Sequence, residues 1–310
     1  MTAQDAPPAA PAPDLAADLA ALREGAALVE RTADLLELAG PDRLRLLNGL
    51  VTADVKSLAA GMTASGFFTT GQGRILADFR LLARAESCWL VLPPGTGETI
   101  RTHLEKYKVA SRVEISQVSD RRLVELRGPG AGEVASLPEP TGDGAFFHLL
   151  EASSAEKELA QWLRGGAASG LRRVSAAAVE IARIEDGELL FGVDFSGENF
   201  PQETGRDSAV SYSKGCYLGQ EVVARIHYRG GVQRLPRGLR FDGDRVPDSG
   251  AELLFEGRSV GRATSATPSP RFGAIGLALL HQRGAAPGNR LEVSGGGGAE
   301  VVALPFGSAV

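Results

Sequence analysis

Apolar residues recur at helical spacing in several short segments of the chain. Leu15, Leu19 and Leu22 are spaced by four and then three positions, so one face of a helix would carry all three. Asp42 follows a Gly-Pro turn and is placed to cap another helix. Helices are therefore expected in four segments, 14–24, 42–50, 98–108 and 154–163, while residues 178–184 fit either a helix or a strand.

Between these helices, runs of β-branched, aromatic and aliphatic residues are bounded by glycine and proline, which is typical of strands. In the stretch 66–78, Gly71 and Gly73 mark a turn between two such flanks and predict a hairpin. Further strands are expected at 34–38, 88–92, 122–126 and 146–150. Residues 25–110 and 120–225 thus have similar element content, which predicts two α+β units in succession.

The pattern changes after Pro236, where short apolar segments alternate with glycine- and proline-rich turns. Several short strands at near-regular spacing are typical of a small barrel or sandwich. Six strands are expected there, over 239–241, 251–255, 259–263, 274–280, 290–293 and 300–303.

Composition places this pattern in a globular protein with more than one domain. The chain has 310 residues, of which 43% are hydrophobic and 23% charged. Its net charge of -5 argues against a general nucleic-acid binder, which needs a clustered excess of Lys and Arg. No apolar run approaches the ~20 residues of a membrane span. The Ala/Pro-rich start has no Lys or Arg, so we expect a disordered tail over residues 1–20, no secretory signal and a cytoplasmic location.

Cysteine and histidine are too few and too scattered to predict a resident metal. The two cysteines, Cys88 and Cys216, do not form a CxxC pair, and the four histidines do not cluster in the sequence. A structural zinc site or a protein-held iron–sulfur cluster needs about four ligands. We therefore expect no metal site, and Cys88 lies in an apolar run that predicts a buried strand position.

The segment 211–231 carries the candidate chemistry. Apolar residues at every fourth position from Leu218 predict a helix that begins near Gly219, although an alternating pattern leaves a strand as the alternative. Cys216 would then lie in a glycine-flanked loop ahead of a helix, where the helix dipole and Lys214 both favour a thiolate. The alternative for a single cysteine is a small buried apolar side chain.

The same segment resembles a known family. Residues 214–221, KGCYLGQE, are similar to the signature of the YgfZ/GcvT-like folate-binding proteins. The similarity covers nearly everything after residue 25, and the further matching stretches are 222–231, 46–55, 73–78, 260–265 and 269–278.

The resemblance implies an α+β fold with three parts in a cloverleaf-like arrangement of the GcvT type. Two α+β subdomains, with a boundary near residue 115, would form a folate-binding unit over 21–235 around a central cleft. Residues 236–310 would form a small C-terminal β-barrel.

The resemblance also implies a function. The expected ligand is tetrahydrofolate, a reduced folate, and the expected partners are iron–sulfur client proteins whose clusters are assembled or repaired. Nucleic acid is not expected as a direct sequence-specific ligand, and no membrane partner is expected. Cys216 would be a reactive or ligand thiol. Two alternatives stay open, a folate-dependent aminomethyl or methyl transferase of the glycine-cleavage type and a non-catalytic scaffold, so turnover is undecided. Pro93 stands where the aminomethyltransferases place an Asn, which weakens the transferase alternative.

Site residues follow from the same resemblance. Glu185 falls where the aminomethyltransferases have a Glu that grips the pterin, and Asp78 matches their catalytic Asp; ordinary roles as a solvated loop carboxylate and a turn residue are the alternatives. Lys214, Arg225 and Arg229 are expected to meet the glutamate tail of folate, with a solvated helix face as the alternative.

Overall fold

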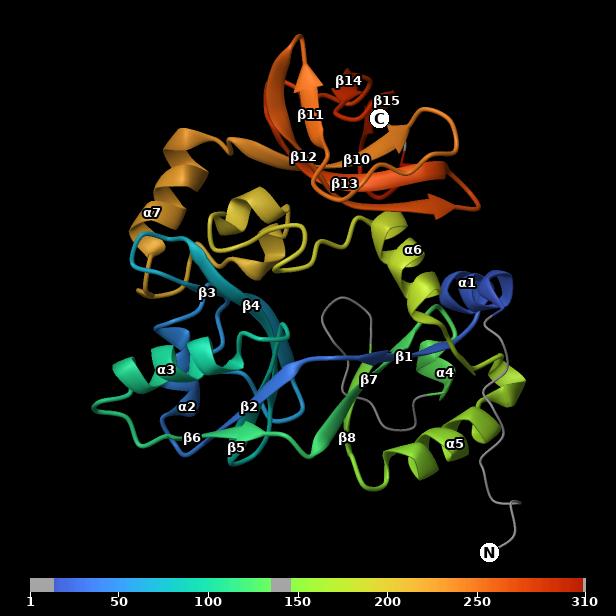
Figure 1. Cartoon of the computed structure of the whole chain (residues 1–310). Coiled ribbons are helices and arrows are strands. Elements are labelled where there is room, and N and C mark those ends of the chain that lie inside the picture. Colours follow the sequence, from blue (N-terminus) through green and yellow to red (C-terminus); the bar gives the residue numbers. More distant parts are fainter. Residues whose placement is uncertain (1–13, 135–145, 309–310) are drawn as a thin grey trace, which may run out of the picture.

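Two sheets and a closed barrel make up the part of the chain described by the structure, a computed structural model that covers residues 14–134 and 146–308 (Figure 1). The first sheet has the strand order β3-β4-β5-β2-β6, and all neighbouring strands in it are antiparallel. Its elements are β2 Asp34–Ala39, α2 Arg43–Asn48, β3 Thr63–Thr69, β4 Ile75–Ala83, β5 Ser87–Leu92, α3 Gly97–Tyr107 and β6 Glu114–Val118.

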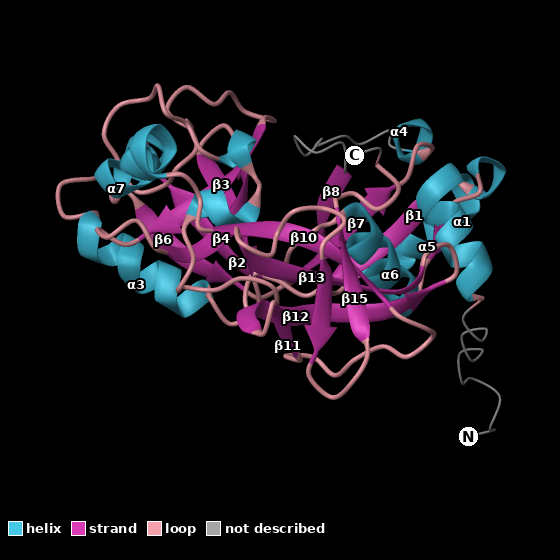
Figure 2. Ribbon diagram, turned by 90° about the horizontal axis from the view of Figure 1, so that it is seen from above, coloured by secondary structure: helices cyan, strands magenta, loops and turns pink. Residues whose placement is uncertain are grey.

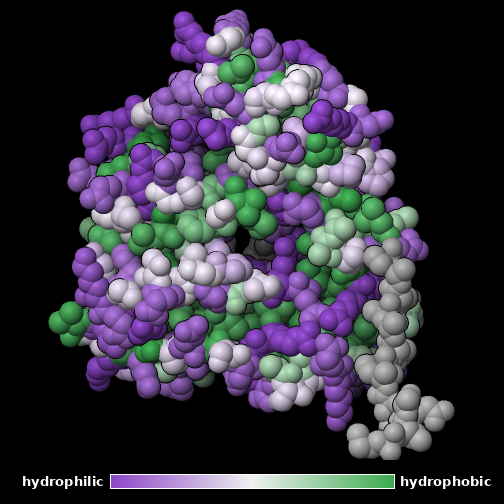
Figure 3. All heavy atoms as spheres, in the orientation of Figure 1, coloured by the Kyte–Doolittle hydropathy of each residue, from purple (hydrophilic) through white to green (hydrophobic). Residues whose placement is uncertain are grey.

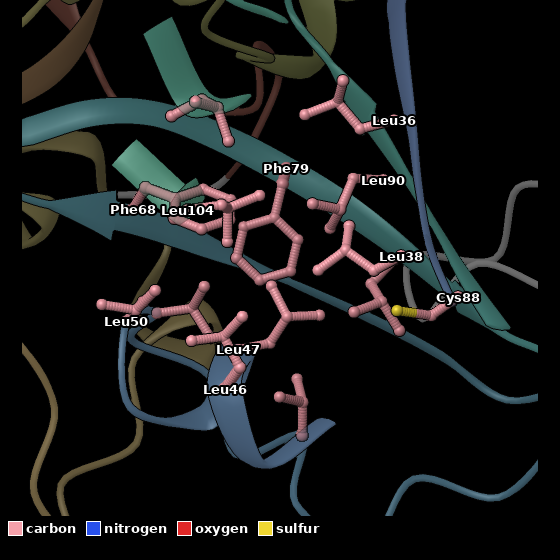
Figure 4. Close-up of a cluster of buried hydrophobic side chains, with 14 of the residues drawn as sticks. Leu36, Leu38, Leu46, Leu47, Leu50, Phe68, Phe79, Cys88, Leu90 and Leu104 are labelled. Atoms are coloured by element: carbon pink, nitrogen blue, oxygen red, sulfur yellow. The ribbon is translucent and has the colours of Figure 1, made fainter. Parts of the chain in front are cut away.

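The helices α2 and α3 bring apolar side chains onto the first sheet. Leu47 and Leu104 pack with Phe79 and other sheet residues in a buried cluster, into which Cys88 also points (Figure 4). The predicted hairpin, the strands at 34–38 and 88–92 and both helices are confirmed. Asp42 is the N-cap residue of α2, as expected, but its carboxylate accepts the backbone N–H of Arg112 at 2.9 Å and no N–H of the helix.

The second sheet has the order β8-β7-β1-β9 and lies beside helices α4, α5 and α6 (Figure 1). The pairs β8-β7 and β7-β1 are antiparallel, and β1 pairs with β9 in parallel over two residues. Its elements are β1 Ala27–Arg31, β7 Arg121–Arg127, α4 Ala131–Val134, β8 Phe146–Glu151, α5 Ala155–Gly165, a 3₁₀ turn Ala167–Ser169, β9 Arg172–Arg173 and α6 Ala176–Asp186. The strands at 122–126 and 146–150 are confirmed, and the open alternative at 178–184 is decided in favour of a helix.

The two sheets are not successive units of sequence. Strand β1 belongs to the second sheet, and only two residues separate it from β2 of the first sheet. A second two-residue connection leads back from β6 to β7. The expectation of one unit over 25–110 and another over 120–225 is therefore corrected. Strand β1, which pairs with β7 and β9 in the second sheet, comes from the start of the chain.

Helix α1, Leu15–Glu24, is the first described element and packs against α6 through Leu19, Ala178 and Ile181. Asp18 fixes this contact, because its carboxylate accepts the N–H of Ser175 at 2.8 Å. The helix predicted over 14–24 is confirmed, and it starts inside the range 1–20 that was expected to be a tail. Residues 1–13 lie outside the described residues.

The barrel closes in the order β10-β13-β12-β11-β14-β15, and all six predicted strands are confirmed. Its strands are β10 Arg234–Phe241, β11 Glu252–Phe255, β12 Arg258–Ser269, β13 Gly273–His281, β14 Arg290–Val293 and β15 Gly298–Val302. Leu239, Leu253 and Leu280 are among the side chains that fill its interior.

A segment of irregular structure joins α6 to the barrel. It contains the 3₁₀ turns Pro201–Thr204 and Asp207–Ala209, helix α7 Gln220–Arg225 and a π-helical turn Ile226–Gly230. Phe195 of this segment packs between Phe67 of the first sheet and Ile275 of the barrel in one buried cluster. The view from above shows α7 next to β3, at the end of the molecule away from α1 (Figure 2). In the described ranges, no helix combines the length and the apolar character that crossing a membrane requires.

Candidate functional site

A cavity of about 1250 Å³ lies where the two sheets, helix α6 and the joining segment meet. The space-filling view shows a hollow near the middle of the face presented there (Figure 3). The wall combines apolar side chains, among them Phe67, Phe79 and Leu123, with charged ones. Its basic and acidic residues are equal in number: Arg23, Arg31, Arg80, Arg127, Arg206 and Arg271 against Glu30, Asp78, Glu125, Glu185, Asp186 and Glu188.

Asp78 lies on β4 and lines this cavity. One carboxylate oxygen, Oδ2, accepts a hydrogen bond from the Arg206 guanidinium at 2.6 Å, and Arg206 is held in place by the carbonyl of Leu189. The other oxygen, Oδ1, is buried and has no hydrogen-bond partner among the described residues. Because buried polar atoms are usually paired, Oδ1 is an acceptor available to a ligand.

Glu185 lies in the last turn of α6, with its side chain 5% exposed in the cavity wall. Arg23 from α1 donates to its Oε2, and the Ser269 hydroxyl from the barrel donates to Oε1 at 2.6 Å. Gly187 ends α6 with a φ of 74°, which glycine adopts without strain. Glu185 thus stands where α1, α6 and the barrel meet.

A network of buried charges forms another part of the wall. Glu125 on β7 is 1% exposed, and its carboxylate contacts Arg80 at 2.5 Å, Arg127 at 3.0 Å and Arg31 at 3.2 Å. Arg127 also pairs with Glu188 at 2.9 Å. Burial raises the pKa of Glu125, but the three guanidinium groups outweigh it and lower the pKa to about 2. The carboxylate is therefore charged, and it fixes three arginines at the cavity surface.

Sequence reasoning missed this network, although the strand 121–127 contains a signal. Glu125 stands among apolar residues in a strand, and a charged side chain at such a position needs a partner. Arg23 and Arg206 were also missed, because nothing near them in the sequence indicates that they meet Glu185 and Asp78.

The cavity fits a reduced folate. A pterin ring presents adjacent N–H donors that a carboxylate accepts in pairs, and the wall offers the carboxylates of Glu185 and Asp78. Arg271 also lines the cavity and forms no ion pair in the described part of the chain, so its guanidinium is available to a carboxylate of the glutamate tail. The apolar wall residues suit the flat aromatic parts of the ligand.

Cys216 is exposed and is not among the residues that line the cavity. Two hydrogen bonds fix the loop that carries Cys216 to the first sheet and its helices. The N–H of Leu218 donates to the Gly49 carbonyl at 3.0 Å, and Thr69 Oγ1 donates to the Leu218 carbonyl at 2.6 Å. The expected helix is present as α7, but it begins four residues after Cys216 and is six residues long. The thiol is thus accessible, and it does not line the cavity.

Lys214 holds this loop and does not face the cavity. Its ammonium group donates to three backbone carbonyls, those of Asn48 at 2.8 Å and of Val51 and Ala53 at 2.6 Å. Burial lowers the pKa of this lysine to about 8. The three donors of the ammonium group are taken up by the protein backbone, and the expected contact of Lys214 with a folate tail stays a prediction.

Arg225 and Arg229 are exposed on α7 and on the turn that follows it, and neither lines the cavity. Helix α7 lies beside β3 at the edge of the first sheet (Figure 1), and the expectation that these arginines meet the folate tail stays a prediction. Cys88 is buried as predicted, and burial raises the pKa of its thiol to about 12. In the ranges that the structure describes, no three His, Cys, Asp or Glu side chains are grouped so as to hold a metal ion.

Comparison of the sequence with known proteins identifies the family to which the chain is related. Residues 10–139 match the GCVT N-terminal domain, and residues 234–306 match the glycine cleavage T-protein C-terminal barrel domain. The tRNA-modifying protein YgfZ of Yersinia pseudotuberculosis serotype O:1b is 28% identical over 244 residues, which cover 72% of this chain and 73% of that protein. The YgfZ protein of Yersinia enterocolitica serotype O:8 is 29% identical over 240 residues, with the same coverage.

A solved structure has the same fold. The glycine cleavage system aminomethyltransferase T from Bartonella henselae superposes with a TM-score of 0.82 at 21% identity and covers 94% of this chain and 89% of its own. The two domain matches, the YgfZ relatives and this shared fold agree with the resemblance carried by residues 214–221. The chain belongs to the YgfZ/GcvT-like family.

Proposed function

We propose that this protein binds a reduced folate in the central cavity and supports iron–sulfur cluster assembly or repair in client enzymes. The observation that carries the folate part is the pair of cavity carboxylates on different parts of the fold. Glu185 is buried at the junction of α1, α6 and the barrel, and Asp78 presents an oxygen without a partner among the described residues. Both are acceptors in a cavity large enough for a pterin and its glutamate tail.

In this proposal each wall residue has a defined task. Glu185 accepts the N–H donors of the pterin, and Asp78 accepts or donates a proton near the ring nitrogens that carry one-carbon groups. Arg206 holds Asp78 in position through the hydrogen bond at 2.6 Å. A bound folate would supply the one-carbon carrier chemistry, and the protein supplies binding, orientation and exclusion of water.

Cys216 acts at a second place on the molecule. Its exposed loop is fixed to the first unit by Lys214, so the thiol is presented to a macromolecule from a rigid support. We assign the contact with an iron–sulfur client or its cluster to this thiol. The YgfZ relatives are named tRNA-modifying proteins, which makes tRNA-modifying enzymes the first client class to examine.

A folate-dependent aminomethyl transferase is the second candidate, and Asp78 is the observation that favours it. Such an enzyme needs an acid near the folate nitrogen, and the free Oδ1 of Asp78 suits that task. Pro93 lines the cavity where the aminomethyltransferases have an Asn, and it cannot supply the hydrogen bonds of an amide. In a scaffold, the third candidate, neither Cys216 nor Glu185 would matter for function.

Calorimetry with 5-formyltetrahydrofolate tests the ligand. Wild-type protein should bind it, and Glu185→Ala should lose about 1–3 kcal/mol of binding free energy, because pterin donors are left without their acceptor. Absence of binding to folded, ligand-free wild-type protein would refute the folate assignment.

A deletion strain separates the three functions. If the maturation role is right, iron–sulfur enzyme activities fall and are restored by wild-type protein but not by Cys216→Ala. Cys88→Ala is the matched control and should restore them. Rescue by Cys216→Ala with loss of rescue by Asp78→Asn would favour the transferase, and rescue by all variants would favour the scaffold.

A further inference from the structure

Arg23 and Glu185 form an ion pair that the proposed folate site would have to break. Glu185 has two carboxylate oxygens, and both are taken in the structure, Oε2 by Arg23 and Oε1 by Ser269. The side chain is 5% exposed, so water does not offer further access to it. Each carboxylate oxygen can accept a second hydrogen bond, but Arg23 lines the cavity and Ser269 does not. A planar ligand edge that approaches the carboxylate from the cavity therefore competes with Arg23 for Oε2.

Ser269 is the fixed partner. Its Oγ accepts the backbone N–H groups of Arg271 and Phe272 at 3.0 and 3.1 Å, so its own hydrogen is directed at Glu185. Arg23 is the partner that can move, because it is a long side chain that lines the cavity and is 24% exposed. Helix α1 itself stays docked on α6 through Leu19 and Asp18, so the exchange needs rotation of one side chain only.

The chemistry of the two competitors is alike. A guanidinium presents N–H donors on neighbouring nitrogens in one plane, and the pyrimidine edge of a pterin presents a ring N–H beside an amino group in the same way. A buried carboxylate without a partner is costly, so Glu185 in the ligand-free protein needs a substitute for the pterin. The guanidinium of Arg23 is that substitute.

A displaced Arg23 has a new partner within reach. Asp186 follows Glu185 in the sequence, lines the same cavity and makes no ion pair in the part of the chain described here. Burial raises the pKa of the Asp186 carboxyl, and Arg23 is already near enough to oppose that rise. Rotation from Glu185 to Asp186 keeps the guanidinium paired.

We infer that Arg23 is an affinity-determining residue of the cavity, which occupies Glu185 in the absence of ligand and moves to Asp186 when the pterin edge of a reduced folate binds. This inference rests on the proposed function. It predicts that the wild-type protein binds folate with a lower apparent affinity than a protein whose Glu185 is always free. The reason is that only the fraction of molecules in which Arg23 has left Glu185 can bind the pterin.

The test is a calorimetric titration of full-length variants with 5-formyltetrahydrofolate. Arg23→Met removes the competitor and should bind about tenfold more tightly than wild type. Arg23→Gln keeps a neutral donor and should show a smaller gain, which also covers the case in which Arg23→Met fails to fold. Arg172→Met is the matched control, because Arg172 pairs with Asp18 of the same helix at 3.0 Å but does not line the cavity, and its affinity should equal that of wild type.

A double-mutant cycle tests the second position of Arg23. Asp186→Asn should weaken folate binding in the wild-type background, because the displaced Arg23 guanidinium then lacks a charged partner. The same substitution should leave folate binding unchanged in the Arg23→Met background, where no guanidinium is displaced. Equal effects in both backgrounds would remove Asp186 from the scheme and overturn the exchange. If wild type binds and both Arg23 variants bind equally or more weakly, the competitor role is wrong while folate binding stands. If no folded variant binds, the proposed function fails with it.

Discussion

Lys214 and Val51 are 163 positions apart in the sequence, yet the ammonium group of the lysine donates to the valine carbonyl at 2.6 Å. The same ammonium also binds the carbonyl of Asn48, the last residue of α2, and that of Ala53 in the loop that follows. This contact fixes the loop that carries Cys216 to the first sheet and its helices. The lysine of the sequence motif is thus a structural anchor for the neighbouring thiol.

Replacing the anchor should loosen the thiol loop and destabilise the fold. Lys214→Met leaves three carbonyls without their donor, and we expect a loss of about 2–4 kcal/mol in the free energy of unfolding. Urea denaturation measures this loss, and amide hydrogen exchange should show faster exchange over the loop than in wild type. Lys157→Met, at an exposed position on α5, is the control and should change neither. Equal stability of Lys214→Met and wild type would contradict the anchoring role.

The two cysteines should differ strongly in reactivity. Cys216 is exposed, whereas Cys88 is buried and has its pKa raised to about 12, so its thiolate is scarce at neutral pH. An alkylating reagent at pH 7.5 should label the folded Cys88→Ala protein quickly and the folded Cys216→Ala protein slowly. Saturating folate should leave the Cys216 rate unchanged, because this thiol does not line the cavity. Protection by folate would place the thiol at the ligand and contradict the two-site arrangement.

Acid should weaken the fold through Glu125. Its pKa is lowered to about 2, so its ion pairs stabilise the protein above pH 4.5, and this stabilisation is lost as the pH falls from about 4.5 towards 2. The shift corresponds to roughly 3 kcal/mol. Wild type should therefore be more stable than Glu125→Gln at pH 7 and nearly equal to it near pH 2, as measured by urea denaturation at several pH values. Glu98→Gln, in an exposed ion pair with Arg101, should show little difference at any pH.

Arg271 should bind a carboxylate in the glutamate tail of the ligand. It lines the cavity and forms no ion pair among the described residues, so Arg271→Gln should weaken binding of a reduced folate about five- to tenfold through loss of one charge-assisted contact. The same variant should bind a pterin without the glutamate moiety as tightly as wild type does. Arg229→Gln serves as the comparison, because Arg229 is exposed outside the cavity, and it should leave both affinities unchanged. A larger loss of folate affinity in Arg229→Gln than in Arg271→Gln would instead place the glutamate tail at the residues expected from the sequence.

Local patterns in the sequence were sufficient for most elements of the fold. The hairpin around Gly71 and Gly73, the barrel strands and the helix at 14–24 each depend on residues close together in the chain. Strands β1 and β6 were not predicted. The sequence of β6 shows little alternation of apolar and polar residues, and most of its residues are exposed. Its strand conformation therefore depends on pairing with β2. The exchange of β1 into the second sheet is a tertiary feature that no local pattern contains.

The candidate site was predicted only in part, for a related reason. Resemblance indicated Glu185 and Asp78, and both line the cavity. The residues that hold them, Arg23 and Arg206, are 162 and 128 positions away, and a charged residue far away in sequence gives no sign of its partner. Proximity to the motif in sequence led to Arg225 and Arg229, which are exposed and outside the cavity.

The two short connections between the sheets limit how the cavity can change. The link from β1 to β2 and the link from β6 to β7 lie side by side, because β2 pairs with β6 and β1 pairs with β7. Leu35, Leu82, Leu123 and Phe147 fill the junction around them. Two adjacent covalent links resist twisting and stretching in a way that a single linker does not, so the sheets form one stiff wall. Any adjustment to a ligand must then come from the opposite side, where α1, α6 and the joining segment meet the barrel.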